Sequence, residues 1–142
     1  ASASLLAEAL GHLRTARREG LGLDGSLEVL DLSDNHLAAG AVDSIGPLLL
    51  DGGPLRRLAL SHNKLRRPGA LRLAEWLPWR RAGCAALDLQ LRHCSLTAEG
   101  SLQVWVAATH AAARVCALDL AENSIDIACI EAMKDALEAA AG

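Results

Sequence analysis

Apolar and polar residues alternate along residues 27–37, and the same pattern returns three times further along the chain. The segment LEVLDLSDNHL has leucine at positions 27, 30, 32 and 37, with Asn35 before the last of them. Its counterparts begin at Leu55, Ala86 and Val115, and the second apolar position of successive copies is separated by 28, 31 and 29 residues. Alternation over a few positions is typical of a half-buried strand. A fixed period of this length indicates a repeat protein, whose units bury their apolar sides against one another.

The apolar strand positions are predicted to form one continuous core. They are Leu30, Leu32, Leu58, Leu60, Leu89, Leu91, Leu118 and Leu120. In the third copy a competing register places Leu87 in the core instead of Leu91. The position three residues after the second leucine of each pair holds Asn35, Asn63, Cys94 and Asn123. A short amide there can bond backbone groups that have left the strand ladder, and the Cys94 thiol is a weaker substitute.

A helical pattern follows each strand. Ten and fourteen residues after the Asn position the chain is apolar in all four copies: Ile45 and Leu49, Leu73 and Leu77, Val104 and Ala108, Met133 and Leu137. Residues four apart share one helix face, so each helix presents an apolar stripe to the sheet. We predict helices at about 39–50, 68–77, 97–113 and 126–140, joined to strands that run parallel. Pro47 predicts a kink or two short helices in the first, and Asp126 is the predicted N-cap of the last.

The pattern Leu-x-x-Leu-x-Leu-x-x-Asn/Cys-x-Leu, followed by an amphipathic helix, resembles the ribonuclease-inhibitor-like class of leucine-rich repeats over residues 27–140. The resemblance implies an α/β fold, a leucine-rich repeat solenoid in which a curved parallel sheet of about four strands is backed by helices. It implies one domain over residues 1–142. Residues 1–25 would form a helical cap or half repeat, and the repeats would span 26–53, 54–84, 85–113 and 114–142.

The same resemblance implies a scaffold that binds another protein through its concave strand face or its edges. The strand-face residues expected to contact the partner are Asp31, Ser33, Asp34, Arg57, Ser61, His62, Asp88, Gln90, Arg92, His93, Asp119 and Glu122. Arg57 and Arg92 are the candidate anchors, because arginine is enriched at binding hot spots. Binding at an edge, through Trp79-Arg80-Arg81 or Arg66-Arg67, is an equally open alternative.

Catalytic, cofactor and metal chemistry find no support in the sequence, and we predict that the chain is not an enzyme. A zinc site at His93 and Cys94 would need converging ligands, whereas Cys94 is predicted to point into the turn and His93 outward. No glycine-rich phosphate loop is followed by the required Lys-Ser/Thr. Two alternatives to a binding scaffold remain open: a GTPase-activating protein of the Ran type, and a structural subunit of a cytoskeletal or ciliary assembly.

Composition narrows the partners and the compartment. The net charge of −3 and the absence of Phe and Tyr give no support to nucleic-acid or membrane binding. The four cysteines show no disulfide or C-x-x-C spacing, which favours reduced thiols and a cytoplasmic location. The apolar residues after strand four predict that further repeats, a second copy or a partner covers that side, as part of a longer chain or a larger complex.

Overall fold

A computed structural model describes residues 27–50 and 53–141 of the chain. It contains one parallel sheet whose strands follow the order of the sequence, β1-β2-β3-β4. The strands are β1 (Val29–Asp31), β2 (Arg57–Ala59), β3 (Leu87–Gln90) and β4 (Val115–Asp119). Each strand therefore pairs with the strand of the next copy of the pattern, as predicted.

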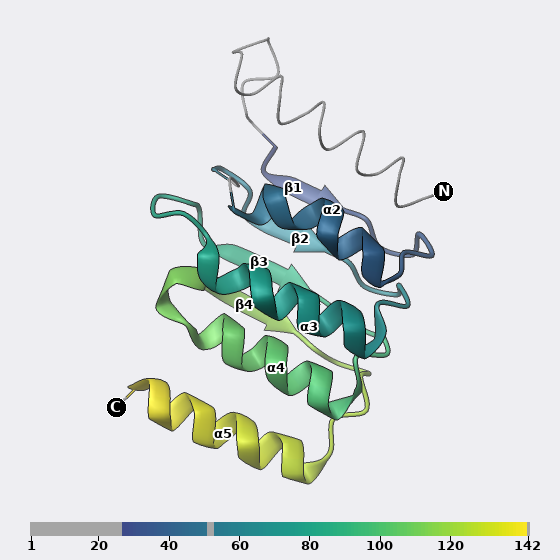
Figure 1. Cartoon of the computed structure of the whole chain (residues 1–142), viewed down its shortest axis with the longest axis vertical. Coiled ribbons are helices and arrows are strands. Elements are labelled where there is room, and N and C mark those ends of the chain that lie inside the picture. The colour runs from purple at the N-terminus through teal and green to yellow at the C-terminus, as the bar shows by residue number, and fades with distance from the viewer. Residues whose placement is uncertain (1–26, 51–52, 142) are drawn as a thin grey trace.

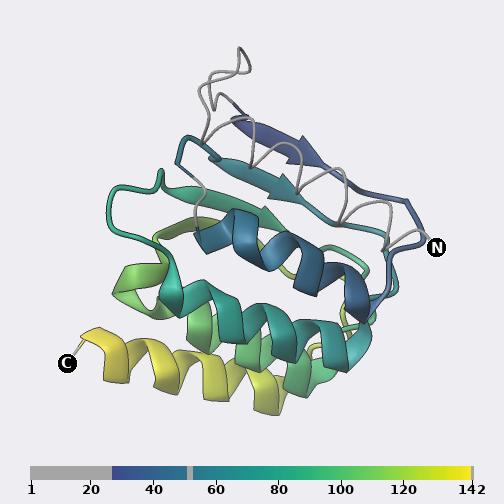
Figure 2. The same cartoon turned by 45° about the horizontal axis from the view of Figure 1, so that its top comes forward.

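Residues 27–50 and 53–141 form four α-helices and two 3-10 helices, all of which lie between strands except the last α-helix, which follows β4. They are α2 (Ala39–Leu50), α3 (Arg66–Trp76), η1 (Leu77–Trp79), α4 (Thr97–Thr109), η2 (Ala111–Ala113) and α5 (Ile127–Ala141). The α-helices lie side by side in chain order and form a second layer behind the sheet (Figures 1 and 2). The molecule is thus a row of β–α units, with one face of the sheet covered by helices. No helix in residues 27–50 and 53–141 has the length and apolar content needed to cross a membrane.

The leucines of the inner strands form the core between the two layers. Leu58, Leu60, Leu89 and Leu91 are fully buried, as predicted. The leucines of the outer strands are less enclosed, because each outer strand has a neighbour on one side among the described residues: Leu120 is buried, whereas Leu30, Leu32 and Leu118 are half-buried.

The two registers considered for the third copy are not exclusive. Leu87 and Leu91 are both fully buried, together with Leu89. Regular alternation along β3 accounts for this, because Leu87, Leu89 and Leu91 lie two residues apart and share one side of the chain. The bulge in this part of the sheet lies in β4, since Leu87 pairs with Val115 while Asp88 pairs with Ala117, which leaves Cys116 as the extra residue.

Helix α2 runs through Pro47 as one helix, so the predicted alternative of two short helices is wrong, whereas the predicted kink stays a prediction. Four side chains of this helix are fully buried on either side of the proline: Val42, Ile45, Leu48 and Leu49. Gly46 lies flat against the Trp76 ring of α3, because a Cβ at Gly46 would be 2.0 Å from a ring atom. Packing of this kind outweighs the single hydrogen bond that proline removes.

The ends of the other helices follow local signals. Asp126 caps α5 as predicted, since its Oδ1 accepts a hydrogen bond from the Cys129 amide at 2.7 Å. Helix α4 ends at Thr109, earlier than the predicted residue 113, because His110 adopts an extended conformation and a 3-10 turn follows. The helix predicted in residues 1–25 lies outside the described residues. The division into one domain of four repeats stays a prediction.

Candidate protein-binding face

The side of the sheet away from helices α2 to α5 carries side chains in a regular grid, which we call the strand face. Parallel register places Val29, Arg57, Asp88 and Ala117 in one row, and Asp31, Ala59, Gln90 and Asp119 in the next. Strand neighbours of this kind sit about 5 Å apart, so side chains in one row reach one another. The backbone ladder fixes these positions before any partner arrives.

Two ion pairs bridge neighbouring strands on this face. Arg57 Nε lies 4.0 Å from an Asp88 carboxylate oxygen, and Arg92 Nε lies 3.3 Å from Asp119. All four side chains are a third to a half exposed, so each pair contributes at most about 1 kcal/mol. Both candidate anchors are therefore engaged within the face, where they offset the charge of two aspartates.

Asp31 and Asp119 also hold the turn that follows their strands. The Oδ1 atom of Asp31 accepts from the Ser33 amide at 2.9 Å, and that of Asp119 accepts from the Ala121 amide at 3.0 Å. The bond from Ser33 is the main cause that lowers the pKa of Asp31, with the Arg57 charge a smaller one. The Asp31 carboxylate thus stays ionised across the neutral range.

A line of four exposed side chains crosses the face at the turn, one from each β–α unit. We call it the turn row: Asp34, His62, His93 and Glu122. All four residues have left-handed backbone conformations, with φ between 54° and 61°. The rings of His62 and His93 are 5.4 Å apart. An unusual conformation repeated at one position gives all four side chains the same direction.

Two residues of the second unit, Ser61 and Ala59, are buried within the strand face. Ser61 is buried, with 9% of its surface exposed, and its Oγ accepts from the Arg92 amide at 3.1 Å. Ala59 is 4% exposed, since it lies between the longer side chains of its row. Ser61 therefore supports the backbone below Arg92, and only 9% of its surface is exposed for contact with another molecule. Ser33 and Gln90 are half-buried, and the other expected residues are at least partly exposed.

Side-chain amides tie each turn to the one before it. Asn63 Oδ1 accepts from the amides of Asn35 and Leu37 in the preceding unit, at 3.0 and 2.9 Å. Asn123 Oδ1 does the same for Cys94 and Leu96, at 2.9 and 3.2 Å. These bonds hold the turn row rigidly, as the Asn positions of the sequence predicted.

Cys94 is the exception in this ladder. It is fully buried and its thiol donates to the Leu60 carbonyl at 3.2 Å, as Asn63 Nδ2 donates to Leu32 at 3.0 Å. Burial raises the pKa of the thiol, so it stays protonated and acts as a donor. The thiol thus replaces the Nδ2 donor of an asparagine but not its Oδ1 acceptor.

The Leucine Rich Repeat family model matches residues 26–49. This match covers β1, its Asn turn and most of α2, and it supports a leucine-rich repeat family for the chain. A search of curated proteins found no match. Leucine-rich repeats are in general protein-interaction modules, which agrees with a rigid, polar and uncovered strand face.

The first alternative site, the edge formed by Trp79-Arg80-Arg81, contains one arginine that is buried. Arg80 is 4% exposed and donates to three carbonyls, those of Leu49, Ala85 and Ala113. Burial lowers the pKa of its guanidinium. Arg80 is thus a structural residue between the β–α units, while the side chain of its neighbour Trp79 is 76% exposed. A sequence of two adjacent arginines gave no signal that one of them turns inward.

Arg67, at the other edge, is also engaged. Its Nε and one terminal nitrogen bind both carboxylate oxygens of Glu99, at 3.0 and 2.8 Å. The bonds to Glu99 raise the pKa of Arg67, and those from Arg67 lower the pKa of Glu99. This exposed pair links α3 to α4, whereas Arg66 of the same turn forms no ion pair with the described residues.

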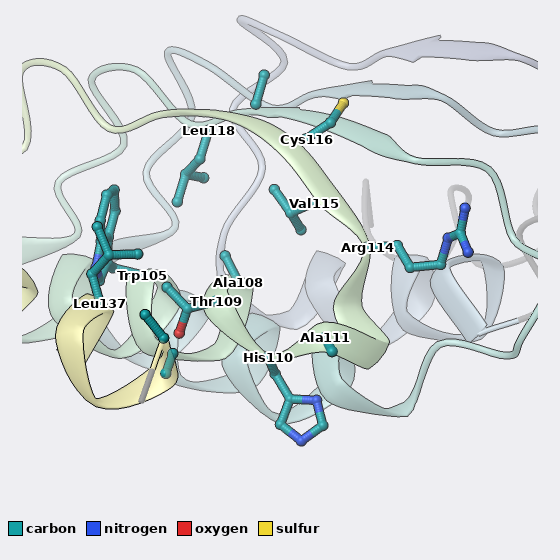
Figure 3. A pocket seen from close by; sticks show the side chains of 13 residues that line it. Trp105, Ala108, Thr109, His110, Ala111, Arg114, Val115, Cys116, Leu118 and Leu137 are labelled. Atoms are coloured by element: carbon teal, nitrogen blue, oxygen red, sulfur yellow. The ribbon is translucent and has the colours of Figure 1, made fainter.

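A cavity of about 570 Å³ lies between β4, α4 and α5, and no pattern in the sequence predicts it. Trp105 and Leu137 stand on its helix side, and Val115 and Leu118 point toward it from β4 (Figure 3). We call this the β4 pocket. Among residues 27–50 and 53–141 there is no group of three or more His, Cys, Asp or Glu side chains that could hold a metal ion.

Proposed function

We propose that this chain is a protein-binding scaffold and that its partner docks on the strand face. The observation that carries the proposal is the turn row, in which each β–α unit contributes one exposed polar side chain in the same backbone conformation. Residues fixed in this way lose little conformational freedom when a partner binds, which favours affinity. The leucine-rich repeat match supports protein binding as the general role.

The charge of the face favours a basic partner. It carries five carboxylates and two arginines, which gives a formal charge of −3 with neutral histidines: Asp31, Asp34, Asp88, Asp119 and Glu122 against Arg57 and Arg92. The two arginines already bridge Asp88 and Asp119. Asp34 and Glu122 are exposed at the two ends of the turn row, where their carboxylates can form ion pairs with arginine or lysine side chains of a partner. Complementary charge of this kind speeds association and selects among partners.

We further infer that the units belong to the ribonuclease-inhibitor-like class and stack as a curved solenoid in one domain. The support is an α-helix of 11 to 15 residues in every unit, together with the spacing of 28 to 31 residues. A cytoplasmic location is part of the same proposal. Its support is that all four cysteines are free thiols.

The test compares capture by three versions of the chain in an extract, with captured proteins quantified by mass spectrometry. The strand-face variant carries Asp34→Lys and Glu122→Lys, and the control carries Asp135→Lys and Glu75→Lys on exposed helix positions. We expect a partner that the wild type and the control capture equally and that the strand-face variant loses. Purified partner should then show the same order in a direct binding measurement.

Equal capture by all three versions would refute strand-face binding. It would favour a structural subunit held by its edges, one of the alternatives. The Ran-type alternative has a separate readout, because a GTPase activator accelerates GTP hydrolysis by its partner GTPase, whereas a scaffold leaves the rate unchanged.

A further inference from the structure

Two histidine rings lie beside each other at the centre of the turn row. His62 and His93 come from consecutive β–α units, and their ring centroids are 5.4 Å apart with the ring planes tilted by 39°. Both side chains are exposed. Among residues 27–50 and 53–141 their ring nitrogens have no hydrogen-bond partner and no ion pair. The fold does not use these nitrogens, so they are available to a ligand.

The backbone holds both histidines in place. The His62 amide donates to the Arg92 carbonyl at 2.9 Å, and the His93 amide donates to the Ala121 carbonyl at 2.9 Å. The residue that follows each histidine is buried, which anchors the chain on that side as well. The Cβ atoms are therefore fixed, and only the two side-chain torsions of each histidine are free to turn.

The separation of the rings matches that of two ligands on a tetrahedral metal ion. A Zn²⁺–N bond measures about 2.0–2.1 Å, and the centroid of the ring lies about 1.1 Å further along the same line. Two imidazoles at a tetrahedral angle then have centroids about 5.2 Å apart, whereas two ligands at a right angle have centroids about 4.5 Å apart. The observed 5.4 Å agrees with the tetrahedral value. Rotation about χ2, a soft torsion in histidine, points one nitrogen of each ring at a shared ion.

We propose that His62 and His93 bind one Zn²⁺ ion on the strand face, through one nitrogen of each neutral ring. Imidazole is a preferred zinc ligand, and zinc favours the tetrahedral geometry that the ring separation matches. The described residues bring no group of three or more metal-binding side chains together, so water fills the two remaining positions in the free chain. Such an ion exchanges readily and keeps two positions open for side chains of another protein.

The other charges of the turn row suit a cation. Asp34 and Glu122 flank the two histidines, each one strand spacing of about 5 Å along the row. Both carboxylates are exposed, and their field raises the local concentration of a divalent cation. Arg92 is the cation next in sequence to the pair, and Asp119 offsets its charge at 3.3 Å.

Zinc titration of the whole chain, followed by calorimetry, tests the proposal. We expect saturable binding of one ion per chain. His62→Asn and His93→Asn should each weaken binding at least about tenfold, because the second imidazole no longer adds its ligand within the same molecule. Asparagine tolerates a left-handed backbone, so these variants keep the turn.

Two control variants remove other zinc ligands. His36 is exposed and has a φ of 54°, as His93 has, but it makes no ring contact with the described residues. Cys116 is an exposed free thiol on β4. His36→Asn and Cys116→Ser should therefore bind zinc as the wild type does.

Nuclear magnetic resonance spectra of the histidine rings identify the ligands. The ring signals of His62 and His93 should move together as Zn²⁺ is added, while those of His36 stay unchanged. No saturable binding at millimolar Zn²⁺, undiminished binding by the variant that lacks both histidines, or an equal loss in either control would overturn the proposal. The measurement uses the chain alone, so its outcome does not depend on whether a partner protein docks on the strand face.

Discussion

Replacing Asn123 with alanine tests the reasoning about the turns most directly. The side chain is 2% exposed, and its Oδ1 is the acceptor for two buried amides, those of Cys94 and Leu96. Its Nδ2 donates to three carbonyls, those of Leu91, Leu120 and Ala121, at 2.8 to 3.1 Å. Alanine offers none of these groups, and no neighbouring side chain takes their place in the described hydrogen bonds.

The magnitude follows from the two amides. A buried N–H left without an acceptor costs about 1–3 kcal/mol, so the pair accounts for roughly 2–6 kcal/mol. The three carbonyls add less, because carbonyl oxygens tolerate missing partners better than amides do. No described residue covers the outer side of the last unit, and water there can replace some of the bonds. We therefore expect Asn123→Ala to lower the free energy of unfolding by about 2–4 kcal/mol.

Urea unfolding followed by circular dichroism measures this loss, and Asn35→Ala is the matched control. Asn35 holds the same position in the first unit but is exposed, and its Nδ2 donates to the Ser33 carbonyl. Its replacement should change the free energy of unfolding by no more than about 0.5 kcal/mol. If the two variants were equally stable, the buried amide ladder would not be what holds the turns, and the reasoning would fail.

Two further predictions use matched positions elsewhere. Gly46→Ala should destabilise by about 1–3 kcal/mol because the new Cβ meets the Trp76 ring, whereas Gly40→Ala in the same helix meets nothing within 4 Å and should stabilise by about 0.5–1 kcal/mol. Thermal unfolding checks both, and the same sign for the two variants would contradict the packing described. Cys116 should react rapidly with a thiol reagent, while Cys94 should stay unreacted in the native state even at alkaline pH, since burial raises the pKa of its thiol. Rapid native labelling of Cys94, followed by peptide mass analysis, would show that its site is open.

The repeated pattern predicts the order of strands and helices well, because the same spacing of apolar and polar residues occurs in all four copies. The alternation of leucines along β2 and β3 and the Asp126 cap depend on residues close in sequence, and the Asn position recurs in three of the four copies. Such local signals are readable without a structure. The parallel sheet then follows, since strands separated by a helix cannot pair as a hairpin.

Residues whose roles depend on distant neighbours were not predictable in the same way. Arg80 turns inward because three carbonyls from separate segments converge on it. Ser61 is buried because its hydroxyl meets the Arg92 amide of the next unit. Pro47 lies within a helix whose Gly46 packs closely against the Trp76 ring of the next unit. The position of each of these side chains depends on packing between units, which cannot be predicted from the pattern within one unit.

The position of Arg80 affects the order in which the units unfold. One guanidinium joins the end of α2, the start of the third unit and the 3-10 turn before β4. In a linear array, the strength of coupling between neighbours decides whether units unfold together or one at a time. Arg80 couples the first three units through a shared buried charge, while α5 lies beyond its reach. We therefore expect unfolding to begin at α5 under mild denaturant, and Arg80→Leu to turn a single cooperative transition of the remaining units into separate ones.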